Sequence, residues 1–267
     1  QLSRFNTGAA GSLRAYPMYI AKDRNGVFQP ISAAPTILKG ANPDQHFVGF
    51  GTGKYFETGD ATTTQQNTYY VLYDNGSGSA AGGESGVVGI AGRGRLQQVT
   101  ANASGNLSPT AACTWGPATS DGDAARRAGW CYDMPGTGER VVYDSVYVPM
   151  TTKAVFSSLI PDSATTPGVC SVSGGTGNNY YVDLVAGTGM QQTSTVGVPG
   201  QPMVMFNDAS TTETKADSTG RRLRTRPVIV GQQGSKGIDA KKVTDETYPV
   251  GRLSWRQINN YLELYKK

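Results

Sequence analysis

The sequence predicts an all-β protein, and three observations support this prediction. Short runs of Val, Tyr and Phe alternate with turns rich in Gly and charge, as in Phe50 to Asp60 and Gly129 to Asp144. The chain has 35 Gly and 14 Pro among 267 residues, and an average chain carries only about 7% Gly. Clustered glycines supply the positive φ angles that reversing strands require. Helical periodicity is confined to the last segment of the chain.

The predicted strands are apolar or β-branched runs bounded by turn residues. In chain order they are Ala34 to Leu38, His46 to Phe50, Thr68 to Tyr73, Gly86 to Ile90, Arg140 to Val148, Ala154 to Leu159, Tyr180 to Val185, Met203 to Phe206 and Pro227 to Val230. Only Ser254 to Tyr265 has apolar residues three and four apart. This spacing predicts a short C-terminal helix.

A weak internal repeat suggests how the strands are organised. The strand HFVGFGTG and the tyrosine pair at Thr68 to Val71 are followed, at an offset of about 111 residues, by TKAVFSSL and the pair at Asn179 to Val182. Two such copies suit successive antiparallel blades of a β-propeller. An irregular sandwich is the alternative. No shift in composition divides the chain, so we expect a single domain over residues 1–267.

The net charge of the chain is too small to indicate a particular class of binding partner. The formal net charge is +4, with one histidine, His46. The basic cluster Arg221, Arg222, Arg224 and Arg226 could meet phosphate or an acidic surface. No nucleic-acid motif accompanies it, and acidic residues lie nearby in sequence, so we interpret it as a solvated strand or loop and predict no nucleic-acid partner.

The chain has three cysteines, so they cannot all pair with one another in disulfides. A disulfide between Cys113 and Cys131 would close a loop and stabilise the fold by about 3 kcal/mol, and it would imply an oxidising compartment. The alternatives are that all three are free thiols or that Cys170 takes one partner. Zinc is disfavoured because the chain lacks a paired CxxC.

Targeting signals are absent from the sequence as it stands. No apolar run of 18 or more residues could span a bilayer, and no secretory signal begins at Gln1. We therefore expect no membrane span, and an exported protein that has already been processed or cut.

The residues do not favour an enzyme. Gly92 to Gly94 could be imagined near a phosphate, but the chain lacks a recognisable nucleophile elbow, metal ligands or acid and base pair. The carboxylates Asp133 and Glu139, six residues apart, are expected to be surface groups. We predict no catalytic residues, no cofactor site and no metal site.

Eight residues are predicted to have structural roles. Gly51 and Gly53 are expected to allow a tight turn, and Glu57 and Asp60 are expected to cap the next turn. An ion pair or turn hydrogen bond at Glu139 and Arg140 is expected to fix the start of a strand. Trp255 and Arg256 are expected to pack on neighbouring blades.

Several strings extend in order along most of the chain, from about Leu2 to Ile258. They are QPISAAPTIL, FGTGKYFETGD, TYYVLYDNG, GWCYDMPGTGERVVYDSVYV, VFSSLIPD and GRLSWRQI. These strings resemble the C-terminal β-propeller of the PilY/PilC family of type IV pilus biogenesis proteins and tip adhesins. The resemblance implies a protein that acts at the pilus tip, promotes pilus extension and in several members binds host surfaces.

The chain departs from the family pattern in two ways. It opens in what resembles the middle of a blade, so the N-terminal blades and upstream region are expected to be missing, or supplied by a separate chain. The acidic calcium loop of some members has no counterpart, because Asp121 and Asp123 supply too few oxygen ligands. Calcium binding is therefore an expectation for the complete family protein and is not transferred to this chain.

The resemblance implies an exported, non-enzymatic factor at the cell surface, at the pilus tip or in the outer membrane or periplasm. Its expected partners are minor pilins or the pilus tip complex, with a host or surface receptor contacted through polar loops. These loops are Thr58 to Asn67, Ser77 to Gly86, Ala101 to Asp123 and Asp208 to Thr219. The alternative is a self-assembling structural β-protein of the cell envelope without pilus association.

Overall fold

The computed structural model describes residues 5–6, 14–15, 18–40, 45–74, 90, 92–112, 114–115, 126–149, 151–162, 175–207, 212–214 and 222–250. The regular elements of these residues are strands, with only short 3-10 turns beside them, so the all-β prediction is confirmed. The chain divides into two compact units, unit 1 with residues Gln1–Val204 and Val230–Lys241 and unit 2 with Met205–Ile229 and Lys242–Lys267. The predicted single domain over residues 1–267 stays a prediction.

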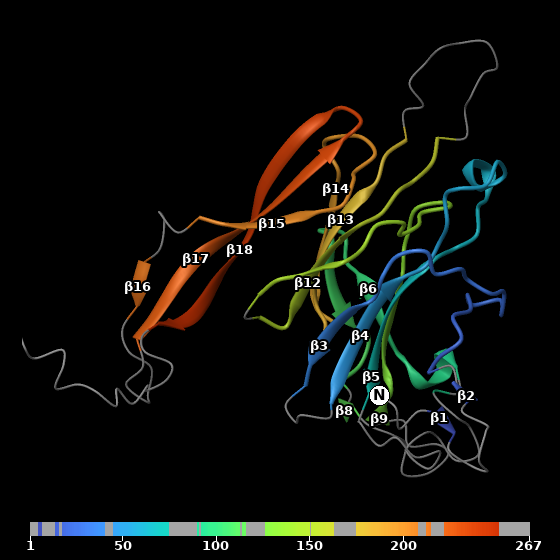
Figure 1. Cartoon of the computed structure of the whole chain (residues 1–267), viewed down its shortest axis with the longest axis horizontal. Coiled ribbons are helices and arrows are strands. Elements are labelled where there is room, and N and C mark those ends of the chain that lie inside the picture. The colour runs from blue at the N-terminus through green and yellow to red at the C-terminus, as the bar shows by residue number, and fades with distance from the viewer. Residues whose placement is uncertain are drawn as a thin grey trace, which may run out of the picture. The chain divides into compact units, whose positions relative to one another are not determined.

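Unit 1 is built on a ten-stranded sheet in the order β11-β12-β13-β14-β7-β6-β10-β5-β4-β3 (Figure 1). Neighbouring strands are antiparallel except β10 and β6, which are parallel. The strands are β3 (Thr36–Lys39), β4 (His46–Gly51), β5 (Thr68–Asp74), β6 (Gln97–Ala101), β7 (Asn106–Pro109), β10 (Gly129–Asp133), β11 (Val146–Tyr147), β12 (Lys153–Ser157), β13 (Asn178–Asp183) and β14 (Gly189–Thr193).

The two edges of this sheet approach each other. The backbone N–H of Ala34, just before β3, donates to Asp144 Oδ1 at 2.7 Å. Thr36 Oγ1 donates to the carbonyl of Ser145, just before β11, at 2.8 Å. The sheet therefore curls almost into a barrel, and side-chain hydrogen bonds rather than a continuous strand ladder link its two edges.

Both halves of the predicted repeat form antiparallel strand pairs. In the first half β4 pairs with β5, and in the second half β12 pairs with β13. The first tyrosine of each pair, Tyr69 and Tyr180, faces the same core. There the two rings stack on Phe156, with centroids 3.8 Å and 4.5 Å from it. The two repeats thus share one hydrophobic core in unit 1.

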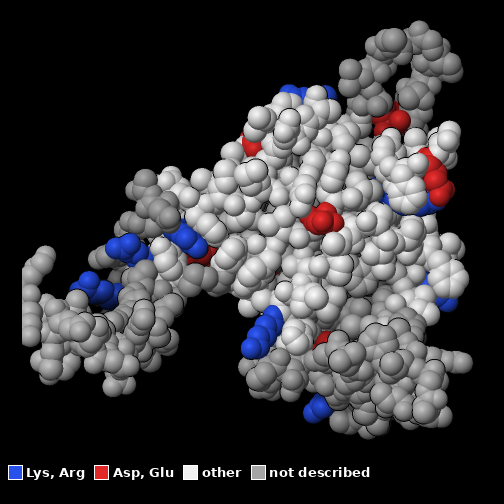
Figure 2. Space-filling model, viewed as in Figure 1, with Lys and Arg blue, Asp and Glu red and all other residues white. Residues whose placement is uncertain are grey.

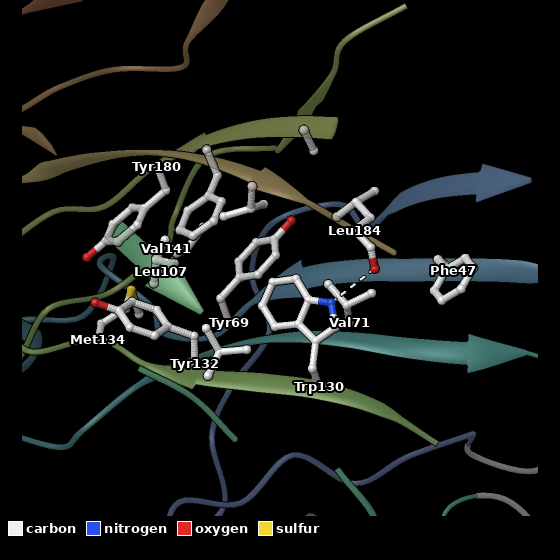
Figure 3. Packing of buried hydrophobic residues seen from close by; sticks show 14 of the residues in the cluster. Phe47, Tyr69, Val71, Leu107, Trp130, Tyr132, Met134, Val141, Tyr180 and Leu184 are labelled. Atoms are coloured by element: carbon white, nitrogen blue, oxygen red, sulfur yellow. Dashed lines mark hydrogen bonds between the residues drawn. The ribbon is translucent and has the colours of Figure 1, made fainter. Parts of the chain in front are cut away.

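Alternation along the central strands creates two cores. In β5, Tyr69 and Val71 face the larger core, while Tyr70 and Leu72 face a smaller core on the other side of the sheet. The period of two side chains in a strand explains this division. Figure 3 shows the larger core, where Trp130 Nε1 donates to the carbonyl of Leu184 at 3.0 Å and so leaves no buried indole N–H unpaired.

Unit 1 also contains short elements outside the large sheet. These are β1 (Phe5–Asn6) paired with β2 (Arg14–Ala15), β8 (Thr114–Trp115) paired with β9 (Arg126–Arg127), and the 3-10 turns η2 (Asp60–Thr62) and η4 (Arg93–Arg95). Turn η4 lies at the start of β6. It brings the Arg93 side chain to Tyr70 of the smaller core.

The remaining strands are β15 (Met203–Phe206), β16 (Thr212–Thr214), β17 (Arg222–Gly234) and β18 (Gly237–Val250). Strands β15 and β16 pair with β17, and β18 also pairs with β17. In unit 2, Glu213 lies opposite Arg224 in the ladder, and the Arg226 guanidinium lies 3.6 Å from the Phe206 ring and 4.5 Å from the Tyr248 ring. A strand location for Arg222, Arg224 and Arg226 agrees with the interpretation of this cluster from sequence.

The strand predictions differ from the structure in two respects. The predicted strand Arg140 to Val148 is reduced to β11, because residues 140–145 use side chains and isolated bridges to reach several other segments. Strands β6, β7, β10, β14 and β18 were not predicted, since Gln, Asn, Asp and Gly interrupt their apolar pattern. The two- and three-residue strands β1, β2, β8, β9 and β16 were also not predicted, because they are too short to show a pattern. Most of the predicted strand Gly86 to Ile90 and the predicted helix Ser254 to Tyr265 lie outside the described residues.

Candidate functional site

The site is a buried junction formed by Gly51, Gly53, Glu139 and Arg140, four of the residues selected from sequence. Gly51 ends β4, Gly53 follows it, and Glu139 with Arg140 leaves the turn after β10. The backbone N–H of Val141 donates to the carbonyl of Thr52 at 3.0 Å, which brings the two segments together. We call these four residues the Glu139–Arg140 junction.

Glu139 is fully buried, and side chains of the second repeat surround it. Its Oε1 accepts hydrogen bonds from Tyr180 Oη at 2.7 Å, from Asn178 Nδ2 at 2.8 Å and from Ser158 Oγ. Its Oε2 accepts the backbone N–H of Gly136 at 2.7 Å. Burial, reinforced by the charge of Glu139, raises the pKa of Tyr180, so its hydroxyl keeps the proton that it donates. Four donors thus compensate a buried carboxylate.

Arg140 is 2% exposed and reaches in the opposite direction, toward the loop between β4 and β5. Its guanidinium donates to the carbonyls of Gly138 at 2.8 Å, Lys54 at 3.0 Å, Asp60 at 2.6 Å and Thr63 at 3.0 Å. Four of its five N–H groups are therefore used. Burial lowers the pKa of Arg140, and the nearby charge of Asp60 opposes this effect.

Glycine is required at positions 51 and 53 because the Glu139–Arg140 segment passes so close. A Cβ at Gly51 would lie 2.3 Å from Val141 Cβ, and one at Gly53 would lie 2.3 Å from Arg140 Cβ. Gly53 also has φ +123°, a region that side chains disfavour. Gly51 ends β4 and Gly53 forms an isolated bridge with Ile31, so the two glycines allow a close approach between distant segments rather than the predicted tight turn.

The loop held by Arg140 is braced from within as well. Asp60 Oδ2 accepts the backbone N–H groups of Phe56 at 2.9 Å and Glu57 at 2.8 Å, which is the capping arrangement expected for Asp60. Lys54 forms ion pairs with Glu57 and Asp60. On this braced loop the Phe56 side chain is 73% exposed. An aromatic ring is therefore presented to solvent on a well-supported backbone.

A second polar cluster, the Arg93–Asp133 network, lies beside the smaller core. Asp133 accepts Arg93 Nη2 at 2.8 Å and 2.9 Å, Arg24 Nε at 2.6 Å and Thr68 Oγ1 at 2.7 Å. Arg93 Nη1 also donates to Tyr70 Oη at 2.9 Å. The network joins β5, β10 and η4 to the segment before β3.

The expectation that Asp133 and Glu139 are surface groups was wrong. The Asp133 side chain is only 5% exposed, and Glu139 is fully buried. Spacing along the sequence could not reveal this, because their compensating donors come from distant segments. The two carboxylates also have different partners: arginines bind Asp133, while uncharged donors bind Glu139.

The predicted Cys113–Cys131 disulfide is not present. Cys131 is a free, buried thiol in β10, and its Sγ lies 3.6 Å from Gln98 Oε1. Burial raises the pKa of Cys131 to about 11, which makes the thiol unreactive at neutral pH. Strand alternation explains its position, since Trp130 and Tyr132 face the larger core and Cys131 faces the smaller one. Cys113 and Cys170 lie outside the described residues.

Other predicted features also lie outside the described residues. They are Trp255, Arg256 and the pair Asp121 and Asp123. Within the part of the chain that the structure describes, no group of three or more His, Cys, Asp or Glu residues could hold a metal ion. No helix in that part is long and apolar enough to cross a membrane.

Sequence reasoning missed the partners of the selected residues. Arg93 and Tyr180 were noted only as parts of longer strings, and Asn178 was not noted at all, although Arg93 binds Asp133 and the other two bind Glu139. A weak signal was available in β13, where two Asn residues directly precede the tyrosine pair. Nothing in the local sequence connects Tyr180 with Glu139, which lies 41 residues away.

The first part of the chain is similar to proteins of a known family. Residues 6–110 match the family model described as the PilY1 beta-propeller domain. The type IV pilus biogenesis factor PilY1 of Pseudomonas aeruginosa, in strains PAO1 and PAK, is 39% identical over 107 residues. The predicted resemblance to the PilY/PilC family is confirmed. The match covers 37% of this chain but only 9% of each PilY1 protein.

The solved PilY1 C-terminal domain of Pseudomonas aeruginosa has a similar fold. The TM-score is 0.52 with 20% sequence identity, and the similarity covers 86% of this chain and 48% of the solved chain. The similarity in fold therefore extends well beyond the matched residues 6–110. Together with the PilY1 family model, it confirms the predicted fold class.

Proposed function

We propose that the chain is part of a type IV pilus biogenesis factor that acts by binding at the pilus tip and supports pilus assembly. The similarity to PilY1 carries this proposal, since residues 6–110 match its propeller and the fold over 86% of the chain resembles its C-terminal domain. The chain spans 9% of the PilY1 proteins that it matches, so their complete activity extends over regions beyond it.

The role that we propose is mechanical and non-enzymatic. The charged groups of the Glu139–Arg140 junction are occupied by hydrogen bonds that hold loops and strands in place. Figure 2 shows charged side chains in small separate groups on a mostly uncharged face. Such a surface suits association through shape and apolar contact. We propose that the chain works without a cofactor of its own, and that a calcium requirement belongs to other parts of the complete protein.

Minor pilins or another component of the tip complex are the proposed partners, at the surface of the cell envelope. Strand β18 offers an edge for this contact, because it pairs with β17 and no described strand covers its other edge. An open edge can accept a strand from a partner. Attachment to a host or other surface would use loops such as Thr58 to Asn67, whose backbone Arg140 supports.

A pull-down with the purified chain as bait tests the proposal. Envelope extracts of a bacterium with type IV pili are passed over native bait and over heat-denatured bait as the control. Captured proteins are identified by mass spectrometry, and the bait's own mass is measured under native conditions. We expect minor pilins or an N-terminal partner on the native bait alone, and a monomeric bait. Homo-oligomers without captured pilins would instead favour a self-assembling envelope protein.

A further inference from the structure

Exposed apolar side chains gather on two segments of unit 1, residues 20–31 and 53–57. Of the eleven large apolar side chains that are exposed in the described part of the chain, six lie on these segments. They are Ile20, Val27, Phe28, Ile31, Tyr55 and Phe56. We call the two segments the apolar loop surface. Clustered exposed apolar residues mark contact with a partner or a membrane.

Hydrogen bonds hold the two segments side by side. The backbone N–H of Gly53 donates to the carbonyl of Pro30 at 2.8 Å, and Ser32 Oγ donates to the carbonyl of Gly53 at 2.7 Å. Gln65 Nε2, on the loop between β4 and β5, donates to the carbonyl of Phe28 at 3.0 Å. The apolar loop surface is therefore one region of unit 1.

The first segment is a braced hairpin with a projecting turn. Asp23 Oδ1 accepts the backbone N–H groups of Asn25 at 2.8 Å and Val27 at 2.9 Å. The buried Gln29 side chain anchors the base of the hairpin to the backbone just before β5. Residues 24–28 are all exposed. The turn thus extends into solvent while its base is held in place.

Basic residues accompany the exposed apolar ones, and the acid of the hairpin is turned inward. Lys22 Nζ lies 4.6 Å from the centroid of one phenylalanine ring of the surface, and Lys54 Nζ lies 5.7 Å from that of the other. The Arg24 side chain is 60% exposed, whereas Asp23 is buried. Glu57 is exposed and pairs with Lys54. Three solvent-accessible cations therefore stand against one such acid, which favours an anionic partner.

We propose that the apolar loop surface docks on a lipid bilayer with anionic headgroups. The projecting apolar side chains enter the headgroup layer, and the cations remain beside the lipid phosphates. A fluid bilayer accommodates two separate loops, whereas a protein partner would need a shape that matches both. A second copy of the chain fits less well, because a symmetric contact would bring Lys22 and Arg24 of both copies together. This inference does not depend on the proposed pilus function.

Sedimentation of the full chain with lipid vesicles tests the proposal. Vesicles of phosphatidylcholine with phosphatidylglycerol are compared with vesicles of phosphatidylcholine alone, at constant ionic strength. We expect binding to the anionic vesicles to be stronger by about tenfold or more, because each cation near the surface adds attraction. No binding to the anionic vesicles would overturn the proposal. Dimers that Phe28→Ser dissociates, without vesicle binding, would also overturn it and assign the surface to a second copy.

Substitutions locate the contact on the apolar loop surface. Phe28→Ser combined with Phe56→Ser should weaken binding to the anionic vesicles by about tenfold, because both rings are lost from the lipid contact. Ile238→Ser removes a side chain that is 80% exposed in β18 and should leave binding unchanged. Equal binding of the double variant and the unaltered chain would overturn the proposal.

A fluorescence measurement decides the question if the double variant fails to fold. The fluorescence added by Phe28→Trp should be quenched by brominated phosphatidylglycerol in the vesicles, because the indole enters the headgroup layer. The fluorescence added by Ile238→Trp should not be quenched. Absence of quenching for Phe28→Trp would overturn the proposal.

Discussion

Among the individual residues, Gly51 and Gly53 matter most, because a Cβ atom at either position would collide with the Glu139–Arg140 segment. Gly53 is the clearest case, because both its φ angle and its distance from Arg140 exclude a side chain. Gly26 has a positive φ of +81° but no atom within 4 Å of a built Cβ. Comparing Gly53 with Gly26 therefore separates the cost of a positive φ from the cost of a steric clash.

Gly53→Ala is expected to destabilise the protein by about 3 kcal/mol, because a strained φ and a clash with Arg140 act together. Gly26→Ala should cost only about 1 kcal/mol, from the φ strain alone. Urea unfolding of both variants provides the measurement. Equal losses in the two variants would mean that the close approach to Arg140 has no energetic weight.

At the element scale, the Arg93–Asp133 network ties β10 to β5, to η4 and to the segment before β3. Burial by itself would raise the pKa of Asp133, but the Thr68 hydrogen bond and the Arg93 and Arg24 contacts outweigh it. The pKa of Asp133 is therefore lowered. A carboxyl whose folded pKa lies below its unfolded value of about 3.9 stabilises the fold above that value, and this stabilisation is lost as the pH falls through the folded pKa.

Asp133→Asn should remove this pH-dependent part of the stability. The difference in unfolding free energy between the unaltered chain and the variant is expected to be largest near neutral pH. It should shrink as the pH falls from about 5 to about 2. Asp245→Asn, in the exposed ion pair with Lys242, is the control and should change stability little at any pH. A constant difference for Asp133→Asn across this range would contradict the assignment.

At the scale of the whole molecule, the Glu139–Arg140 segment joins the two repeats within unit 1. Glu139 is bound by Ser158, Asn178 and Tyr180 around β12 and β13, while Arg140 is bound by the loop between β4 and β5. Two adjacent residues of opposite charge thus link the two halves of one sheet through hydrogen bonds. Removing either charge leaves buried partners without compensation.

Glu139→Gln is the sharpest test of this junction. Whichever way the amide is turned, its NH₂ group faces at least one buried donor that the carboxylate now accepts. We expect a loss of about 2 kcal/mol in unfolding free energy. Glu57→Gln makes the same change in an exposed pair with Lys54 and should alter stability by less than about 1 kcal/mol. Similar losses for both variants would show that Glu139 does not hold the repeats together.

From the sequence alone one could predict the fold class, the paired tyrosine strands and the family resemblance, and select for attention the four residues that meet at the junction. Alternating apolar residues, turn glycines and ordered strings are local properties, so they can be read along the chain. Long-range packing, which appears only in the folded chain, buries Asp133 and Glu139 and leaves Cys131 as a free thiol. Burial and hydrogen-bond partners depend on which distant segments pack together. A pattern of neighbouring residues along the chain does not contain that information.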